Sequence, residues 1–194
     1  RYMINGEPTE SRLASASKGS LRLVLRTRGQ EAHSAYPELG NSAVDAMVGL
    51  LVDLGQVELP TDPALGETTV NVGTIQGGSA ANVFAGKCEA EMMIRLVGDY
   101  EEVKDMISEV VGDRAEMDWG SGIPPEEFHV IDGFDTTTVA YTSDIPILSN
   151  WGTPLLFGPG SIHHAHTDRE HISVDELRES VEAYVQITRT LLAS

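Results

Sequence analysis

The chain has 194 residues, with 13 basic and 30 acidic side chains and a formal net charge of −17. Hydrophobic residues make up 41% of it and charged residues 22%, which is ordinary for a globular protein and excludes wholesale disorder. The acidic balance argues against nucleic acid and anionic membranes as partners, because both need a basic surface. The single cysteine, Cys88, excludes an internal disulfide and favours a reducing, cytoplasmic compartment.

The chain opens as if inside a structural element. Its first residue is Arg1 rather than Met, and apolar residues run directly into Gly6-Glu7-Pro8-Thr9, as at the end of a strand. We therefore expect a piece of a longer protein. A small polar stretch, residues 15–20, then separates the first segment (1–18) from a block with clear periodicity (19–118).

The periodic block begins with a strand, a loop and a helix. Leucines at positions 21, 23 and 25 alternate with other residues and predict a strand. A loop follows between Gly29 and Gly40, after which Asn41 or Ser42 caps a helix. The expected apolar stripe of this helix is Val44, Met47, Val48, Leu51 and Leu54.

The second half of the block adds two strands, a helix and a last strand. Strands are expected at residues 69–75 and 88–97, the latter with alternate residues from Cys88 to Leu96 on one face. Asp99 and Glu102 form a capping-box pattern for the helix, and a strand near residues 114–118 closes the block. The order βαββαβ predicts a ferredoxin-like α+β domain.

The tail, residues 119–194, has a different character. Short buried strands are expected at 137–141 and 154–157, and a Ser173–Glu176 capping box opens a final helix. The expected apolar stripe of that helix is Val174, Leu177, Val181, Tyr184, Val185, Thr188 and Leu191. Together with residues 1–18 the tail offers only a thin core, so it is expected to pack on something else.

The densest cluster of chemically active side chains is the segment 158–171. It holds four of the six histidines and two carboxylates, a combination that suits zinc, cobalt or manganese. A solvated histidine-rich loop and an adventitious metal scavenger are the alternatives. His164, His166 and Asp168 also resemble the His-x-His-x-Asp core of metallo-β-lactamase-type hydrolases, but Arg169 stands where that fold has a further histidine.

Three further candidates stand outside that cluster, each with a plain structural alternative. Glu7 lies in a turn enforced by Pro8, and the alternative is a simple turn with a surface glutamate. His33 lies in a glycine-flanked loop, and the alternative is a solvated loop histidine without a catalytic role. Arg95, in a strand after the glycine-rich stretch 71–78, suits either a carboxylate clamp or a structural ion pair.

Taken in chain order, these motifs resemble one family. They are Gly6-Glu7-Pro8-Thr9, Lys18-Gly19, His33-Ser34 before the helix, Asn71-x-Gly73-x-Ile75-x-Gly77-Gly78, Asn82, Arg95 and Gly158-Pro159-Gly160 leading to Ala165-His166. The sequence resembles the acetylornithine deacetylase, succinyl-diaminopimelate desuccinylase and aminoacylase family of two-metal amidohydrolases (metallopeptidase clan MH). Within it, the Gly158 segment is most similar to the acetylornithine deacetylases and related N-acetyl-amino-acid deacylases.

The resemblance implies an α/β catalytic domain of zinc-aminopeptidase type, interrupted by a ferredoxin-like lid that serves dimerisation. Residues 1–18 and 119–194 would be catalytic-domain segments and 19–118 the lid. Glu7 would ligate one of two divalent metal ions, zinc or else cobalt or manganese, and His166 the other. These two residues are therefore expected to approach each other in space. The lid implies a homodimer.

The resemblance also implies roles in substrate recognition. His33 would reach across the dimer into the partner's active site and stabilise the tetrahedral oxyanion. Asn82 and Arg95 would hold the substrate carboxylate, helped by backbone N–H groups around Gly158 and Gly160. The substrate would be a small N-acyl amino acid or a peptide.

The sequence departs from the family in what it lacks. The family's His-x-Asp, bridging Asp and Glu-Glu pair, which includes the general base, have no counterpart here, and His163 and His164 leave the choice of histidine ligand open. We therefore expect the C-terminal half of a metal-dependent deacylase, acting on a substrate such as N-acetylornithine and inactive alone. The alternatives are a non-catalytic dimerisation module from a truncated family member and a histidine-rich metal carrier.

Overall fold

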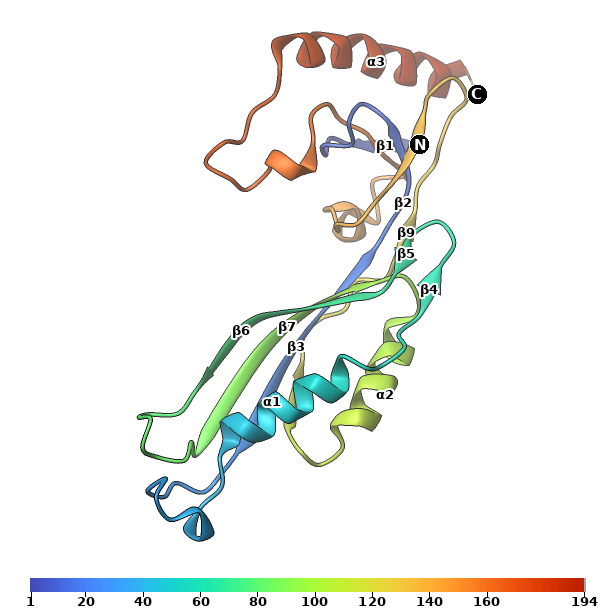
Figure 1. Cartoon of the computed structure of the whole chain (residues 1–194). Coiled ribbons are helices and arrows are strands. Elements are labelled where there is room, and N and C mark those ends of the chain that lie inside the picture. Colours follow the sequence, from blue (N-terminus) through green and yellow to red (C-terminus); the bar gives the residue numbers. More distant parts are fainter. Residues whose placement is uncertain (194) are drawn as a thin grey trace. The chain divides into compact units, whose positions relative to one another are not determined.

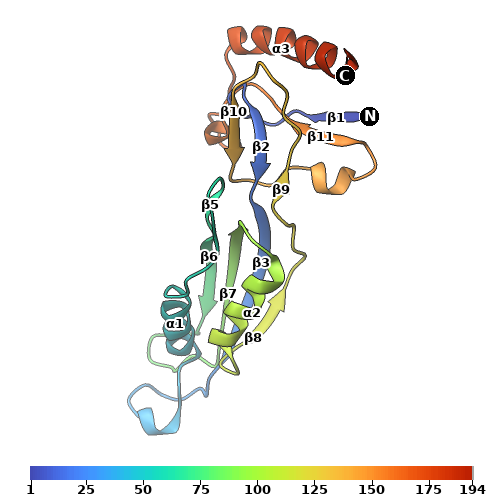
Figure 2. The same ribbon diagram turned by 90° about the vertical axis from the view of Figure 1, so that its right-hand side faces the viewer.

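The computed structural model describes residues 1–193 and divides the chain into two compact units (Figures 1 and 2). Unit 1 comprises Arg1–Lys18 and Glu126–Ser194, and unit 2 comprises Gly19–Pro125. Among residues 1–193, no helix combines the length and apolar character needed to cross a membrane. The fold is mixed α/β, and each unit has its own sheet.

Unit 2 is ferredoxin-like, as the sequence predicts. Its four-stranded antiparallel sheet has the order β6-β7-β3-β8, and two helices cover one face (Figure 2). The elements are β3 (Gly19–Arg28), α1 (Ala43–Leu54), β6 (Thr69–Gly77), β7 (Lys87–Leu96), α2 (Tyr100–Val111) and β8 (Glu116–Trp119). A hairpin of β4 (Thr61–Asp62) and β5 (Gly66–Glu67), which the sequence did not predict, precedes β6.

The core of unit 2 follows from strand alternation. Leu21, Leu23 and Leu25 of β3 are fully buried and stand opposite Ile94, Met92 and Ala90 of β7. This register places every second residue of both strands under the helices, and the predicted inner face of β7 is confirmed. Burial of this apolar face is what closes the unit.

The first helix is rotated relative to its prediction. The buried residues of α1 are Ala43, Met47, Leu50 and Leu54, whereas Val48, expected on the stripe, is half exposed. Contacts outside the helix set this rotation. The Ala43 N–H donates to the Ala85 carbonyl (2.8 Å) and the Ala43 carbonyl accepts from the Thr27 hydroxyl (2.7 Å), which turns Ala43 inward.

The predicted helix starts are confirmed by their caps. The Ser42 hydroxyl accepts from the Asp45 N–H, and the Asp99 carboxylate accepts from the Glu101 N–H. Ser173 and Glu176 form the full reciprocal capping box before α3 (Val174–Ala193). Caps are short-range contacts, which is why sequence reasoning finds them.

Unit 1 contains a mixed sheet with the order β1-β11-β2-β10, and β9 also pairs with β2. The strands are β1 (Tyr2–Asn5), β2 (Leu13–Ser17), β9 (Glu126–Glu127), β10 (Thr136–Val139) and β11 (Thr153–Leu156). Strands β1 and β11 run parallel, so the loops that follow them leave the same edge of the sheet. Short 3₁₀ helices are η1 (Pro37–Leu39, in unit 2), η2 (Ile145–Leu148) and η3 (Ile162–His164).

The final helix buries a different face from the one predicted. Ile187 is fully buried and packs in a cluster with Leu13, Leu155 and Phe157. Five residues of the expected stripe are exposed instead, namely Val174, Leu177, Val181, Val185 and Thr188. The prediction of a single buried stripe is therefore wrong, because α3 has two neighbouring apolar faces and only one of them contacts the rest of unit 1.

Candidate functional site

The predicted metal ligand Glu7 lies where two parallel strands end. It follows β1, and Gly158 follows the neighbouring strand β11. The two loops approach so closely that a Cβ on Gly158 would overlap the backbone of Glu7, so only glycine fits there. The parallel pairing thus brings residues 151 positions apart into contact at the carboxyl end of the sheet.

The charges of Asp144 and His166 act on the Glu7 carboxyl. Partial burial raises the pKa of the Glu7 carboxyl, the charge of Asp144 raises it further, and His166 lowers it. That Glu7 and His166 act together as metal ligands stays a prediction. A half-buried carboxylate beside a second carboxylate and an imidazole is an environment that a divalent cation would stabilise.

Backbone strain is concentrated in the same loops. Glu10, Ser11 and His166 have φ values of 56°, 58° and 60° and are the non-glycine residues with positive φ in residues 1–193. The left-handed region is unfavourable for side chains with a Cβ and persists only where surrounding contacts enforce it. Such strain often marks functional sites, and here it falls on a predicted metal ligand and on the turn after the other.

The histidine-rich segment separates into distinct environments. His163 lines a pocket, whereas the ring of His164 lies 4.4 Å from that of His171. The His166 N–H donates to the Glu170 carboxylate (2.9 Å), which fixes the strained backbone of this residue. Of the three neighbouring histidines, His166 is the one whose charge acts on Glu7.

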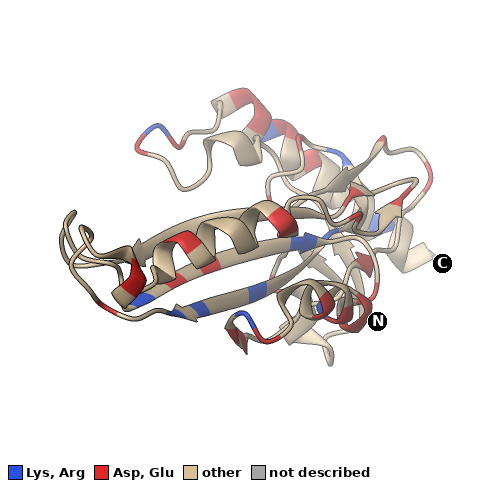
Figure 3. Ribbon diagram, turned by 60° about the horizontal axis from the view of Figure 1, so that its bottom comes forward, with Lys and Arg blue, Asp and Glu red and all other residues tan. Residues whose placement is uncertain are grey.

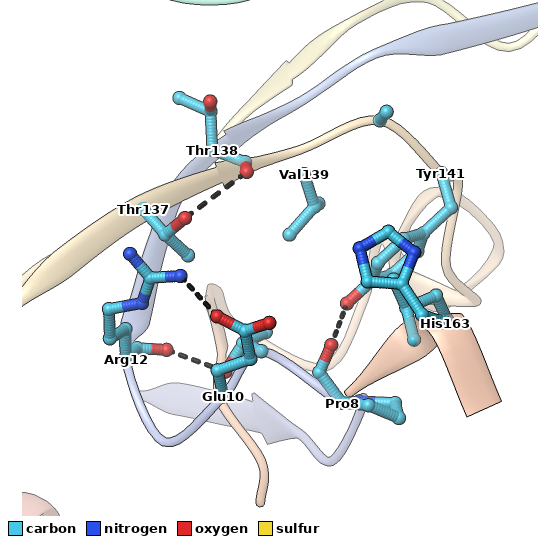
Figure 4. A pocket seen from close by; sticks show the side chains of 11 residues that line it. Pro8, Glu10, Arg12, Thr137, Thr138, Val139, Tyr141 and His163 are labelled. Atoms are coloured by element: carbon cyan, nitrogen blue, oxygen red, sulfur yellow. Dashed lines mark hydrogen bonds and ion pairs between the residues drawn. The ribbon is translucent and has the colours of Figure 1, made fainter. Parts of the chain in front are cut away.

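A pocket of about 250 Å³ opens beside the Glu7 turn (Figure 4). Pro8, Thr138, Val139, Tyr141 and His163 are among the residues that line it. The Tyr141 hydroxyl donates to the Pro8 carbonyl (2.8 Å), as Figure 4 shows. Burial, and next the charge of Glu7, raise the pKa of Tyr141 well above its usual range, so its hydroxyl stays protonated as a donor.

Glu7 and His166 supply the kinds of ligand atom that zinc, cobalt and manganese accept, a carboxylate oxygen and an imidazole nitrogen. Within residues 1–193, however, no group of three or more His, Cys, Asp or Glu side chains is arranged to hold a metal ion. These residues therefore fit a metal centre as contributors, and a complete ligand set is not formed by the described part of the chain.

His33 and Asn82 lie together in unit 2. Their loops pair through a bridge between His33 and Val83, and the Ser34 N–H donates to the Asn82 carbonyl (2.9 Å). The His33 Nδ1 atom accepts from the Ala35 N–H (3.1 Å), which in the neutral ring puts the proton on Nε2. The side chain is exposed, so Nε2–H is available as a donor to another molecule.

Arg95 differs from its neighbours on the sheet face opposite the helices. Figure 3 shows the basic residues of unit 2 spread along its strands. Arg22, Arg26 and Arg28 each form an ion pair with a glutamate, at 2.6, 2.7 and 3.7 Å. Among residues 1–193, Arg95 has no carboxylate within ion-pair distance, so its guanidinium is free to bind an external carboxylate.

The structure does not bring Asn82 and Arg95 together. Asn82 lies in the loop before β7 and Arg95 lies near the end of that strand. Eight residues separate Lys87 from Arg95, or about 27 Å of extended chain at ~3.4 Å per residue. Within one chain the two side chains cannot hold the same carboxylate, and Asn82 instead accompanies His33.

The Gly158 loop is also used differently from its expectation. The Gly158 N–H donates to the Thr9 hydroxyl (3.1 Å) rather than pointing free toward a ligand. Gly160 has a φ of +80°, and its carbonyl accepts from the Glu10 N–H (2.9 Å). Both glycines therefore join two loops, and their contribution to substrate binding stays a prediction.

Sequence reasoning missed Asp144, Tyr141 and Thr9 as parts of this site. Tyr141 and Asp144 follow β10, which pairs in parallel with β2, and their approach to Glu7 depends on tertiary packing. Tyr141 ends the predicted buried strand 137–141, and the one sequence signal for Asp144 is the polar run that follows this strand. Thr9 stood within a recognised motif, but nothing local indicated its partners.

Comparison with known proteins shows which family the chain resembles. The family model described as "Peptidase dimerisation domain" (M20) matches residues 15–118. A protein of Aspergillus terreus described as a probable carboxypeptidase is 41% identical over 95% of this chain, and a peptidase M20 domain-containing protein of Schizosaccharomyces pombe is 38% identical over 93%. The matches cover 48% and 46% of those proteins, so the chain spans about half the length of these curated relatives.

Solved structures show a similar fold. The crystal structure of aminopeptidase PepT from Bacillus cereus has a TM-score of 0.67 and 18% identity, covering 95% of this chain and 55% of that chain. A tripeptidase from Staphylococcus aureus has a TM-score of 0.61 and 19% identity, covering 81% and 48%. At these identities the likeness concerns the fold.

Proposed function

Since this chain belongs to the M20 peptidase family, whose dimerisation-domain model matches residues 15–118, we propose that it is part of a metal-dependent amidohydrolase. The observation that carries the proposal is the close approach of the Glu7 turn and the Gly158 loop at the carboxyl ends of β1 and β11, where the charges of Asp144 and His166 act on Glu7. Glu7 and His166 would each contribute one ligand to a centre of two divalent metals, zinc or else cobalt or manganese. Residues outside this sequence would supply the remaining ligands and the general base.

The proposed substrate has a free carboxylate. Arg95 is the unpaired arginine on a face where its neighbours are paired, and a bidentate arginine–carboxylate pair gives both energy and orientation. An N-acyl amino acid, in the first place an N-acetyl one such as N-acetylornithine, and a peptide with a free C-terminus both satisfy this requirement. The description of the Aspergillus terreus relative as a probable carboxypeptidase supports the second.

The proposed roles divide between the two units. When bound, the metals would polarise the scissile carbonyl and make water nucleophilic at neutral pH. The Nε2–H of His33 would donate to the oxyanion that develops on the acyl carbonyl, and Asn82 would stand beside it at the same site. Because the His33 and Asn82 loops pair within unit 2, we assign both residues together to the active site of the partner subunit.

The dimer would form along the edge of the unit 2 sheet. Strand β6 is an edge strand exposed over its whole length, and Val70, Val72 and Ile75 point to the side of the helices without being covered. Val48 and Val52 of α1 are exposed as well. An unprotected apolar edge of this length favours pairing with a second copy.

Sedimentation of the 194-residue chain tests the dimer. We expect Ile75→Lys to convert a micromolar dimer into a monomer while its circular dichroism stays unchanged. Ile147→Lys, which changes an exposed apolar residue of unit 1, is the matched control and should leave the dimer intact. A folded wild-type chain that sediments as a monomer would contradict the dimer.

Activity is best tested in a hybrid enzyme, which joins this chain to the part of the Aspergillus terreus relative that it does not match. With added zinc, the hybrid should hydrolyse N-acetyl amino acids or C-terminally free dipeptides and should reject the same compounds carrying a C-terminal amide. The 194-residue chain alone should show no activity above that of zinc. Hydrolysis of the amides at equal rates would refute carboxylate recognition.

A second candidate function is a non-catalytic dimerisation module. It is favoured by the absence of a three-ligand metal cluster within residues 1–193. A hybrid enzyme that folds and dimerises but binds no zinc and hydrolyses neither substrate class would support it. Cytoplasmic localisation remains a prediction that rests on the single, buried Cys88.

A further inference from the structure

Thr9, two residues after Glu7, is a buried polar side chain with every hydrogen-bonding group engaged. It is 3% exposed. Its hydroxyl donates to the Arg12 carbonyl (2.6 Å) and accepts from the Gly158 N–H (3.1 Å). Its own N–H donates to the Gly158 carbonyl (3.1 Å). Thr9 thus bonds within its own turn and to a loop 149 residues away.

The neighbouring backbone extends this link between the two loops. The Ser11 N–H donates to the Gly158 carbonyl (3.0 Å), and the Glu10 N–H donates to the Gly160 carbonyl (2.9 Å). The missing Cβ of Gly158 permits the approach, since any side chain there would collide with the Glu7 backbone. The Thr9 hydroxyl is the buried side-chain group among the bonds between the loops, and a substitution can remove it; the Ser161 hydroxyl adds an exposed, longer bond to the Glu10 carboxylate (3.4 Å).

The link also explains why a strained turn is stable. Glu10 and Ser11 are consecutive left-handed residues, a conformation that needs surrounding contacts to persist. The Thr9 hydroxyl closes this turn through the Arg12 carbonyl, and the amides of both strained residues donate to the Gly158–Gly160 loop. Without the hydroxyl, the turn would keep only the backbone bond from the Arg12 N–H to the Thr9 carbonyl (3.2 Å), and Gly158 would lose the acceptor of its N–H.

We propose that Thr9 is a positioning residue that joins the Glu7 turn and the Gly158–Gly160 loop into one rigid assembly. Its effect is to hold the Glu7 turn, and with it the Glu7 carboxylate, in a fixed position at the carboxyl end of β1. The consequence for metal binding rests on the proposed function, whereas the mechanical link between the loops does not. The substitution Thr9→Val keeps the shape and removes the hydroxyl, and Thr9→Ser keeps the hydroxyl.

Amide hydrogen exchange in the 194-residue chain tests the link. In Thr9→Val we expect the Ser11 and Gly158 amides to exchange about tenfold to a hundredfold faster, because each lost hydrogen bond contributes modestly and one N–H loses its acceptor. Thr9→Ser should stay within about threefold of wild type. Amides of β3 and β7 in unit 2 are the internal control. Unchanged exchange at Ser11 and Gly158 in Thr9→Val would overturn the proposal.

If Thr9→Val unfolds unit 1, amide hydrogen exchange in the wild-type chain tests the link instead. The Thr9, Ser11 and Gly158 amides should then show one common opening rate and one common denaturant dependence in the wild-type chain, since they belong to one assembly. Independent opening of the Glu7 turn and the Gly158 loop would overturn the proposal.

Zinc titration separates positioning from a merely structural role. With ZnCl₂ as the probe, the amide resonances of Glu7 and His166 should shift in the wild-type chain. The zinc concentration at the midpoint of the titration should rise about tenfold or more in Thr9→Val and return to the wild-type value in Thr9→Ser. The comparison is made at a temperature at which all three forms are fully folded. A midpoint unchanged in Thr9→Val would overturn the positioning role. Wild-type resonances unaffected by zinc would mean that these two ligands alone do not bind it; the midpoint is then measured in the hybrid enzyme, where an unchanged value in Thr9→Val would overturn the positioning role.

Discussion

Units 1 and 2 differ in how completely their apolar faces are buried. Unit 2 covers one sheet face with α1 and α2 and pairs the arginines of the other face with glutamates, except at Arg95. Unit 1 buries only one of the two apolar faces of α3. It also contains all the left-handed non-glycine residues of the described chain. The regular unit therefore suits presentation and assembly, whereas the strained, incompletely covered unit suits chemistry.

The largest expected effect separates the two faces of α3. Ile187→Ala should lower the free energy of unfolding of unit 1 by about 2–5 kcal/mol, because it opens a cavity among Leu13, Leu155 and Phe157. Val185→Ala, on the exposed face, should change it by less than about 0.5 kcal/mol. Urea denaturation of the 194-residue chain measures both. Equal losses would mean that the outer face of α3 is covered in solution.

His33 tests whether unit 2 delivers a catalytic group. In the hybrid enzyme, His33→Ala should lower turnover by about 10²–10³-fold, the usual cost of losing one oxyanion donor, without changing zinc content or dimerisation. Mixing this variant with subunits that lack the general base should restore part of the activity, because one site of the mixed dimer then has both groups. Verified subunit exchange without restored activity would reject the action across the interface.

Substitution of Arg95 tests whether the unpaired arginine of unit 2 binds the substrate carboxylate while the paired arginines do not. Arg95→Gln should raise KM in the hybrid enzyme by about tenfold to a hundredfold for a substrate with a free carboxylate, with little change for an uncharged analogue. Arg22→Gln, which breaks an exposed ion pair with Glu91, is the control and should leave KM unchanged. An equal rise in KM for both variants would remove the special role of Arg95.

The smallest expected effect is a pH dependence from Glu7. Burial and Asp144 raise the pKa of its carboxyl in the folded chain, so ionisation costs stability as the pH rises from its ordinary pKa to the folded one, and the cost persists above that. In metal-free solution, Glu7→Gln should therefore be no more stable than wild type near pH 3.5, and more stable at pH 7. Thermal unfolding at both pH values measures this, with the exposed Glu179→Gln as control. A gain that is the same at both values would contradict the sign.

Local patterns predicted the elements of unit 2 because they are encoded by near neighbours. The alternation from Cys88 to Leu96 determines the inner face of β7, and the caps at Ser42 and Asp99 determine where α1 and α2 begin. The rotation of α1 escaped prediction because its cause, the bonds of Ala43 to Thr27 and Ala85, lies outside the helix.

Only the residues of the candidate site that lie in sequence motifs could be predicted. The motifs predicted Glu7 and His166 as metal ligands, which stays a prediction, and the parallel pairing of β1 with β11 explains how Glu7 reaches that edge of the sheet. Asp144 and the Thr9–Gly158 bonds were not, because they join segments more than 130 residues apart through tertiary packing. The second apolar face of α3 was merged with the first, since both follow helical periodicity.

The most direct test of the proposed metal centre is the crystal structure of the hybrid enzyme with zinc, using anomalous scattering at the zinc edge to locate the ions. We predict two zinc ions, one with a Glu7 carboxylate oxygen and the other with a His166 ring nitrogen at about 2.0–2.2 Å. Glu7→Gln and His166→Ala should each lower the zinc content. A zinc centre that excludes both side chains would contradict the assignment of this chain to the metal site.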